Sequence, residues 1–133
     1  MKYITGTYAL NLPSALGTPG DWHQSALNWE EPRYLDTDDS VFGDWGIEDG
    51  IAPGLGKVKK ANHIRACLDL IDEGYYSSAQ GMRKDFIDEE QYTNEVFIKV
   101  SLLKNKPNWD EIDRFMGREY LCDWLDYKEL AGL

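Results

Sequence analysis

The segment that decides the fold class is NHIRACLDLIDEG, residues 62–74. Its apolar side chains recur at the i, i+3, i+4, i+7 spacing that forms one face of a helix, namely Ile64, Cys67, Leu68 and Ile71. Asn62 is a suitable N-cap, and Gly74 is a suitable terminator. The spacing therefore predicts an amphipathic α-helix over residues 63–73.

Residues 75–133 continue with helical patterns. We expect a short helix over residues 75–80, a second that begins at Thr93, and a third that begins at Asn108. Glu111 lies three residues after Asn108, which resembles a capping box, and we expect Gly117 to break that helix. A last helix is expected over residues 120–127.

The residues before this helical part have a different composition. Residues 1–56 contain four prolines and eight glycines, which divide them into short pieces. Strand composition occurs over residues 3–10, where Gly6 suggests a bulge or turn, and over residues 33–35 and 40–42. Residues 25–29 suit either a strand or one helical turn.

The chain therefore divides near residue 56. We predict a single α+β domain, residues 1–133, which is an ordinary size for one domain. A small, irregular, strand-containing N-terminal part (1–56) is expected to pack on a C-terminal helical part (57–133) of three to five helices.

The net charge of −10 is concentrated in the N-terminal part. Residues 1–56 hold nine acidic and two basic side chains, whereas residues 57–133 hold fifteen and twelve. This field repels nucleic acid and anionic membranes and attracts a basic protein, although excess acid also keeps a small protein soluble. We expect a basic protein partner and neither a nucleic-acid nor a membrane partner. A cluster of Lys57, Lys59 and Lys60 can pair with the acidic part.

The N-terminal residues lack the apolar core of a signal peptide. No apolar run in the sequence approaches the roughly 20 residues that a membrane-spanning helix needs. We therefore expect a cytoplasmic protein.

The segment TPGDWHQS, residues 18–25, has the most functional composition. A catalytic interpretation makes His23 a base, Asp21 its orienting partner and Ser25 a nucleophile or binder. Neighbouring residues seldom converge as such a triad must. The structural alternative is that Asp21 caps a turn, Trp22 enters the core and His23 bonds a backbone carbonyl.

His63 is the other histidine and a further catalytic candidate. The two histidines could meet carboxylates such as Asp36, Asp38 or Asp39, but the spacing of a metal site, as in HxxxH or HExxH, is missing. We therefore expect no metal and no cofactor.

Three tryptophans, Trp22, Trp29 and Trp45, lie outside any helical stripe. Tryptophan is favoured at the energetic centres of interfaces. The elements GDW at residues 20–22 and 43–45 add a carboxylate beside two of these indoles. The candidate partner-binding residues are Asp21, Trp22, His23, Trp29, Asp44 and Trp45.

Five segments carry a resemblance: residues 3–11, 20–27, 42–48, 61–66 and 109–117. Together they resemble a family of short uncharacterised bacterial proteins, similar to the small partner proteins of toxin–antitoxin or phage-defence loci. The resemblance implies a binding protein and gives no catalytic residue.

Three functions remain open. The first is a protein-binding module, an antitoxin, immunity or anti-defence protein that neutralises its partner with an acidic, aromatic surface. The second is a small enzyme that uses His23 with Asp21 on a nucleotide or another small substrate. The third is a DNA mimic. Whether the chain is an enzyme stays open, and we favour the binding protein.

Overall fold

A four-stranded mixed sheet forms the N-terminal part of the molecule. The computed structural model describes residues 1–28 and 30–133, with Gln24 and Ser25 described by their backbone alone. The strands β1 (Lys2–Thr5), β2 (Arg33–Asp36), β3 (Ile47–Ala52) and β4 (Gly56–Ala61) lie in the order β2-β1-β4-β3. β1 is parallel to β4 and antiparallel to β2, and β3 is antiparallel to β4.

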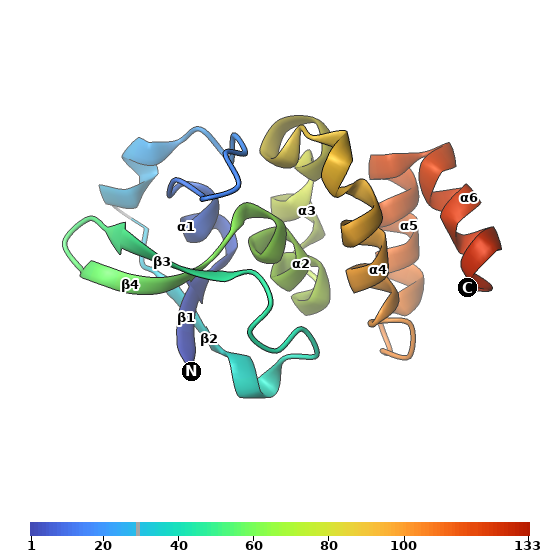
Figure 1. Cartoon of the computed structure of the whole chain (residues 1–133), viewed down its shortest axis with the longest axis horizontal. Helices are drawn as coiled ribbons and strands as arrows, with labels where there is room; N and C mark the ends of the chain where they lie inside the picture. The colour runs from blue at the N-terminus through green and yellow to red at the C-terminus, as the bar shows by residue number, and fades with distance from the viewer. Residues whose placement is uncertain (29) are drawn as a thin grey trace.

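In the described part of the chain, six α-helices complete the fold, and five of them follow the sheet. They are α1 (Gly6–Leu10), α2 (His63–Glu73), α3 (Tyr76–Ala79), α4 (Thr93–Ser101), α5 (Trp109–Tyr120) and α6 (Cys122–Ala131). Short 3₁₀ turns occupy Gln24–Asn28, Thr37–Asp39 and Glu90–Tyr92, and a π-helix occupies Met82–Ile87. The sheet and α1 lie at one end of the long axis, α2 and α3 in the middle, and α5 and α6 at the other end (Figure 1). The α+β prediction is confirmed.

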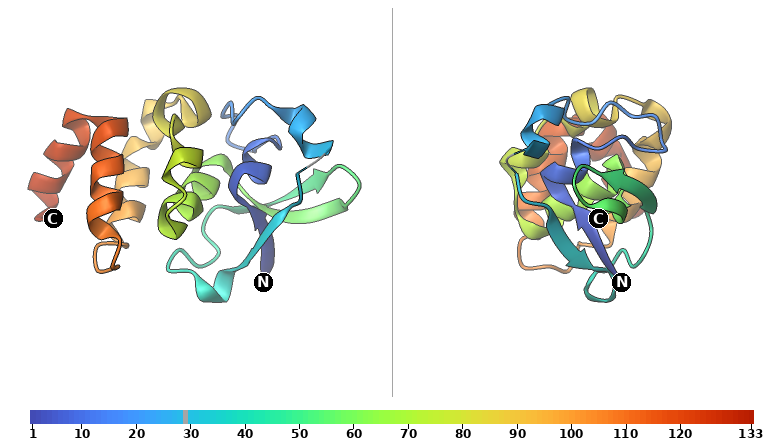
Figure 2. Two further views of the ribbon diagram at one scale, coloured as in Figure 1. Left: turned by 180° about the vertical axis from the view of Figure 1, so that it is seen from behind. Right: turned by 90° about the vertical axis from the view of Figure 1, so that its left-hand side faces the viewer.

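Helix α2 has the predicted bounds and the predicted ends. The Asn62 side-chain oxygen accepts a hydrogen bond from the Arg65 amide at 2.8 Å, and Gly74 takes φ +87° after the last turn. Every residue from His63 to Ile71 is buried, so α2 is covered on all sides rather than on one face. Seen end-on, the strands lie in front of the helices (Figure 2).

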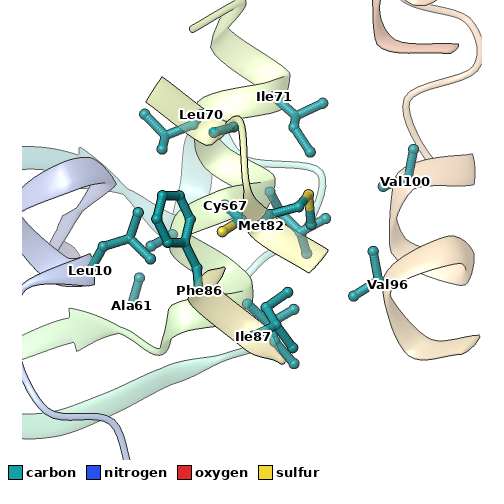
Figure 3. Close-up of a cluster of buried hydrophobic side chains, with 14 of the residues drawn as sticks. Leu10, Ala61, Cys67, Leu70, Ile71, Met82, Phe86, Ile87, Val96 and Val100 are labelled. Atoms are coloured by element: carbon teal, nitrogen blue, oxygen red, sulfur yellow. The ribbon is translucent and has the colours of Figure 1, made fainter. Parts of the chain in front are cut away.

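The core surrounds α2. Figure 3 shows Cys67 and Ile71 of α2 beside Met82 and Ile87 of the π-helix, with Val96 of α4 opposite. These side chains are between 0 and 2 % exposed. One contiguous core thus joins the N-terminal sheet to the helices.

The β3–β4 hairpin was not predicted from the sequence. The lysine cluster belongs to strand β4, so the helical part begins at His63 and not at residue 57. Lysines and carboxylates are poor strand formers, but here they face each other across the hairpin and neutralise one another. Lys59 Nζ lies 2.5 Å from Asp49, and the buried Lys60 pairs with Glu48, which confirms the expected pairing with the acidic part.

Several local predictions were wrong. The strand expected over residues 3–10 ends at Thr5, where Gly6 (φ +69°) turns the chain into α1. The strand expected over residues 40–42 is replaced by a turn over residues 41–46. For residues 25–29, where a strand and a helical turn were both predicted, the described residues Gln24–Asn28 form the helical turn. Helix α5 continues through Gly117 to Tyr120. The side-chain nitrogen of Asn108 donates to the Tyr76 hydroxyl at 2.9 Å, and the Asn108 side chain makes no capping hydrogen bond to α5.

Candidate functional site

A buried asparagine holds the loop that the sequence marked as functional. Asn11 follows α1 and is 2 % exposed. Its side-chain oxygen accepts from the His23 amide at 2.9 Å, and its side-chain nitrogen donates to Asp21 Oδ2 at 3.2 Å. Both ends of the Asp21–His23 tripeptide are thereby fixed to α1.

Backbone contacts hold the same loop from the other side. The Asp21 amide donates to the Leu10 carbonyl at 2.9 Å, and the Gly20 amide donates to the Phe86 carbonyl at 3.0 Å. A Cβ on Gly20 would lie 2.2 Å from the Leu10 oxygen and 2.8 Å from His63 Cε1. Only glycine allows this approach, so the loop is clamped between α1, α2 and the π-helix.

These anchors hold Trp22 out in solvent. The residue has φ +66°, and its side chain is 76 % exposed, which contradicts the alternative that it enters the core. A bulky residue in the left-handed region costs about 1–2 kcal/mol. The fold therefore maintains a strained backbone in order to present a large apolar ring to water.

Trp22 borders a hollow of about 380 Å³ between the loop and the π-helix. We name this cavity the Trp22 hollow. Its lining residues are Pro19, Asp21, Trp22, His23, Lys84, Asp85, Phe86 and Asp88. In Figures 1 and 2 the loop after α1 lies beside the segment that follows α3, in agreement with the Gly20–Phe86 hydrogen bond.

Unusual backbone geometry converges on this hollow. The described part of the chain has three non-glycine residues with positive φ, and two of them, Trp22 and Asp88 (φ +47°), line it. The third, Leu121, connects α5 to α6. A π-helix is rare and often marks a functional site, and strained residues cluster at such sites. The Trp22 hollow is therefore the leading candidate site.

The Asp21–His23 pair expected from the sequence is formed. His23 Nδ1 lies 3.2 Å from Asp21 Oδ1, and the His23 side chain is 72 % exposed. The second carboxylate oxygen of Asp21 is held by Asn11, so the imidazole has a fixed orienting partner. The side chain of Ser25 and all of Trp29 lie outside the described residues.

His63 belongs to a different hollow. It lines a separate cleft of about 810 Å³, which Trp22 also lines. His63 Nε2 is 2.7 Å from the Leu12 carbonyl, which can only accept, so Nε2 carries the hydrogen and Nδ1 accepts from the Thr18 hydroxyl at 2.7 Å. Burial lowers the pKa of His63, which keeps the ring neutral. With both nitrogens engaged, the ring joins α2 to the loop, and the structure does not bring the two imidazoles into one hollow.

The second GDW element has a structural role. Asp44 is exposed, but Trp45 is half-buried against the core and lies under the Lys99 ammonium, 4.8 Å from its ring centroid. Neither residue lines the Trp22 hollow. The partner-binding candidates Asp44 and Trp45 are thus separated from Asp21, Trp22 and His23.

A buried cation, which the sequence analysis missed, explains the position of Trp45. Arg65 is fully buried and donates to the carbonyls of Gly43 (2.9 Å) and Trp45 (2.5 Å). Its Nε donates to Asp69 Oδ1 at 3.0 Å. The available signal was the i, i+4 spacing of Arg65 and Asp69 inside an otherwise apolar helix.

The hollow also contains residues that no sequence signal indicated. Lys84, Asp85 and Asp88 come from the π-helix and the residue after it, about 60 positions from Trp22. The Gly81 amide donates to Glu119 at 2.9 Å, and Arg83 binds the Tyr120 carbonyl at 3.0 Å. These contacts fix the π-helix against α5.

Compared with known proteins, the chain matches no family model, no curated protein and no solved structure. In the described residues, no helix has both the length and the apolar character needed to cross a bilayer. In the same residues, histidines, cysteines and carboxylates do not gather in groups of three or more that could hold a metal.

Proposed function

We propose that this chain is a protein-binding module that neutralises a basic partner, as an antitoxin, immunity or anti-defence protein does. The observation that carries the proposal is Trp22, 76 % exposed at φ +66° on a loop fixed from several sides. An indole held rigidly in solvent loses little conformational entropy when a partner covers it, so it is a suitable energetic centre for an interface.

The charge of the chain supports a basic partner. Net charge is −10, and three aspartates but one lysine line the Trp22 hollow. A field of this sign speeds the encounter with a cationic surface. The exposed thiol of Cys122 is compatible with a reducing compartment, and we place the function in the cytoplasm.

Binding to the product of an adjacent gene tests the proposal. The full chain is titrated with each purified neighbour in a calorimeter, together with Trp22→Ala and the control Tyr34→Ala, which removes a half-exposed ring on β2. Loss of an interface centre costs 2 kcal/mol or more, so we expect Trp22→Ala to weaken binding about thirtyfold and Tyr34→Ala less than about twofold. Equal affinities for the two variants, or no complex with any neighbour, would contradict the proposal.

The enzyme hypothesis keeps one specific observation, the oriented Asp21–His23 pair at the edge of the hollow. A general base needs such a partner and access to a substrate, and His23 has both. His23→Gln and Asp21→Asn should then abolish turnover of a nucleotide or another small substrate without affecting the affinity for a protein. The binding module predicts that the native chain turns over no such substrate and that Trp22→Ala, rather than His23→Gln, weakens the binding of a protein.

A further inference from the structure

The residues that line the Trp22 hollow indicate the chemical group that it binds. The geometry points to the guanidinium of an arginine side chain on the partner, stacked on the Trp22 indole and hydrogen-bonded to the carboxylates of Asp85 and Asp88. This inference rests on the proposed function and specifies the recognised group.

The pairing of charges favours a cation as the group that binds in the hollow. The ion pairs in the described part of the chain use most of its buried and half-buried acids, including Glu48, Asp69, Asp72 and Asp113, and none of them includes Asp85 or Asp88. Both aspartates are exposed, and so is Trp22. Charge within the hollow therefore remains available to a cation from outside.

The shape of the site favours a guanidinium over an ammonium group. Trp22 lines the hollow from the loop, and Asp85 and Asp88 line it from the π-helix and the residue that follows it. A guanidinium is planar, stacks on aromatic faces and donates from several N–H groups in one plane, so it can contact both walls at once. A lysine ammonium is a compact, strongly hydrated charge. It can donate to the carboxylates, but it lacks the planar face that stacks on an indole.

Arg65 of this chain already binds in this way. Its guanidinium carbon lies 5.0 Å from the ring centroid of Tyr3 and 5.3 Å from that of Phe42, while Nε donates to Asp69. The buried site joins aromatic faces to a carboxylate around one guanidinium. The Trp22 hollow offers the same pair of groups at the surface.

The test uses the full ¹⁵N-labelled chain and defined peptides. The indole Nε1–H signal of Trp22 is assigned from the spectrum of Trp22→Phe and followed during titration with acetyl-Gly-Arg-Gly-amide. Peptides with citrulline, the neutral isostere, or with lysine replace the arginine. We expect a saturable shift with arginine at millimolar peptide, at least about fivefold weaker binding with citrulline and at least about threefold weaker binding with lysine.

Two variants test whether the carboxylates of Asp85 and Asp88 bind the guanidinium. Asp85→Asn and Asp88→Asn each keep the size of the side chain, and asparagine tolerates the positive φ of residue 88. We expect each to weaken arginine binding about fivefold or more, whereas Asp39→Asn, an equal charge change at an exposed site on the 3₁₀ turn after β2, changes it less than about twofold.

An unchanged Trp22 signal, equal binding of the citrulline or lysine peptide, or equal effects of the three aspartate variants would each overturn the arginine assignment. The proposed function fails separately. If Trp22→Ala abolishes the protein complex while arginine peptides leave the Trp22 signal unchanged, the binding module stands and the recognised group is another one.

Discussion

Replacing Arg65 by methionine should destabilise the fold more than any surface arginine substitution. The guanidinium is fully buried, and its removal leaves the Asp69 carboxylate in the core without its cation. Breaking a buried pair from one side costs about 3–5 kcal/mol. The carbonyls of Gly43 and Trp45 also lose their donor, so residues 43–45 should loosen.

This cost translates into a large thermal shift. Unfolding entropy is about 2.1 cal/mol/K per residue, which gives roughly 0.28 kcal/mol/K for the 133 residues. A loss of about 4 kcal/mol therefore lowers Tm by about 14 °C. The control is Arg33→Met, which removes the same group from the surface pair with Glu73 and should cost about 1 kcal/mol or less.

Calorimetry and urea unfolding measure these differences, and Arg65→Met/Asp69→Leu completes a double-mutant cycle. Because the second change removes the stranded carboxylate, the double variant should lose at least about 1.5 kcal/mol less than the sum of the single variants. Burial raises the pKa of Asp69, and Arg65 opposes that rise, so the penalty of Arg65→Met should also shrink as pH falls from 7 to 5. Equal costs at positions 65 and 33, or additive single effects, would refute the reasoning.

Three further outcomes are expected. Gly20→Ala should cost at least about 2 kcal/mol more than Gly17→Ala in urea unfolding, because both glycines have φ near +73° but only Gly20 has atoms within 4 Å of a new Cβ. The pKa of His63 is lowered in the fold, so its contribution to the free energy of unfolding is present above the unfolded pKa of about 6.5 and is lost as pH falls through the folded pKa. The free energy of unfolding should therefore fall less steeply between pH 7 and pH 5 in His63→Gln than in the native chain. Parallel pH profiles of the two proteins would contradict this expectation. A thiol reagent should modify the exposed Cys122 in the native protein and Cys67 only after unfolding, since burial raises the pKa of the Cys67 thiol; equal rates would be inconsistent with the core.

The α-helices that follow the sheet were predictable because their signals are local, whereas α1 was predicted as part of a strand. Asn62 and Gly74 mark the ends of α2 through contacts within four residues of each end. The β3–β4 hairpin could not be predicted in this way. Its lysines and carboxylates disfavour strands individually, and their pairing becomes favourable only when residues 48 and 60 meet across the sheet.

The candidate site was likewise predictable from the sequence only in part. Asp21, Trp22 and His23 are adjacent in sequence, so their composition identified one wall of the hollow. The other wall depends on a π-helix, for which residues 82–87 carry no periodic signal, and on the hydrogen bond between Gly20 and Phe86. Three of the partner-binding candidates named from the sequence, Asp21, Trp22 and His23, therefore line the hollow, and the residues of the π-helix were not predicted.

Helix α2 explains how a strained loop can persist at the surface. The left-handed backbone of Trp22 costs about 1–2 kcal/mol, and that of Asp88 costs less because aspartate tolerates this region, in a domain whose stability is of order 5–15 kcal/mol. Such strain survives only where the surroundings leave no alternative. His63 holds the loop through Thr18 and Leu12, while Cys67 and Ile71 lie in the same buried cluster as Met82 and Ile87 of the π-helix (Figure 3). Helix α2, buried from His63 to Ile71, thus supports both walls of the Trp22 hollow, and the free energy of its core offsets the strain that keeps the indole in water.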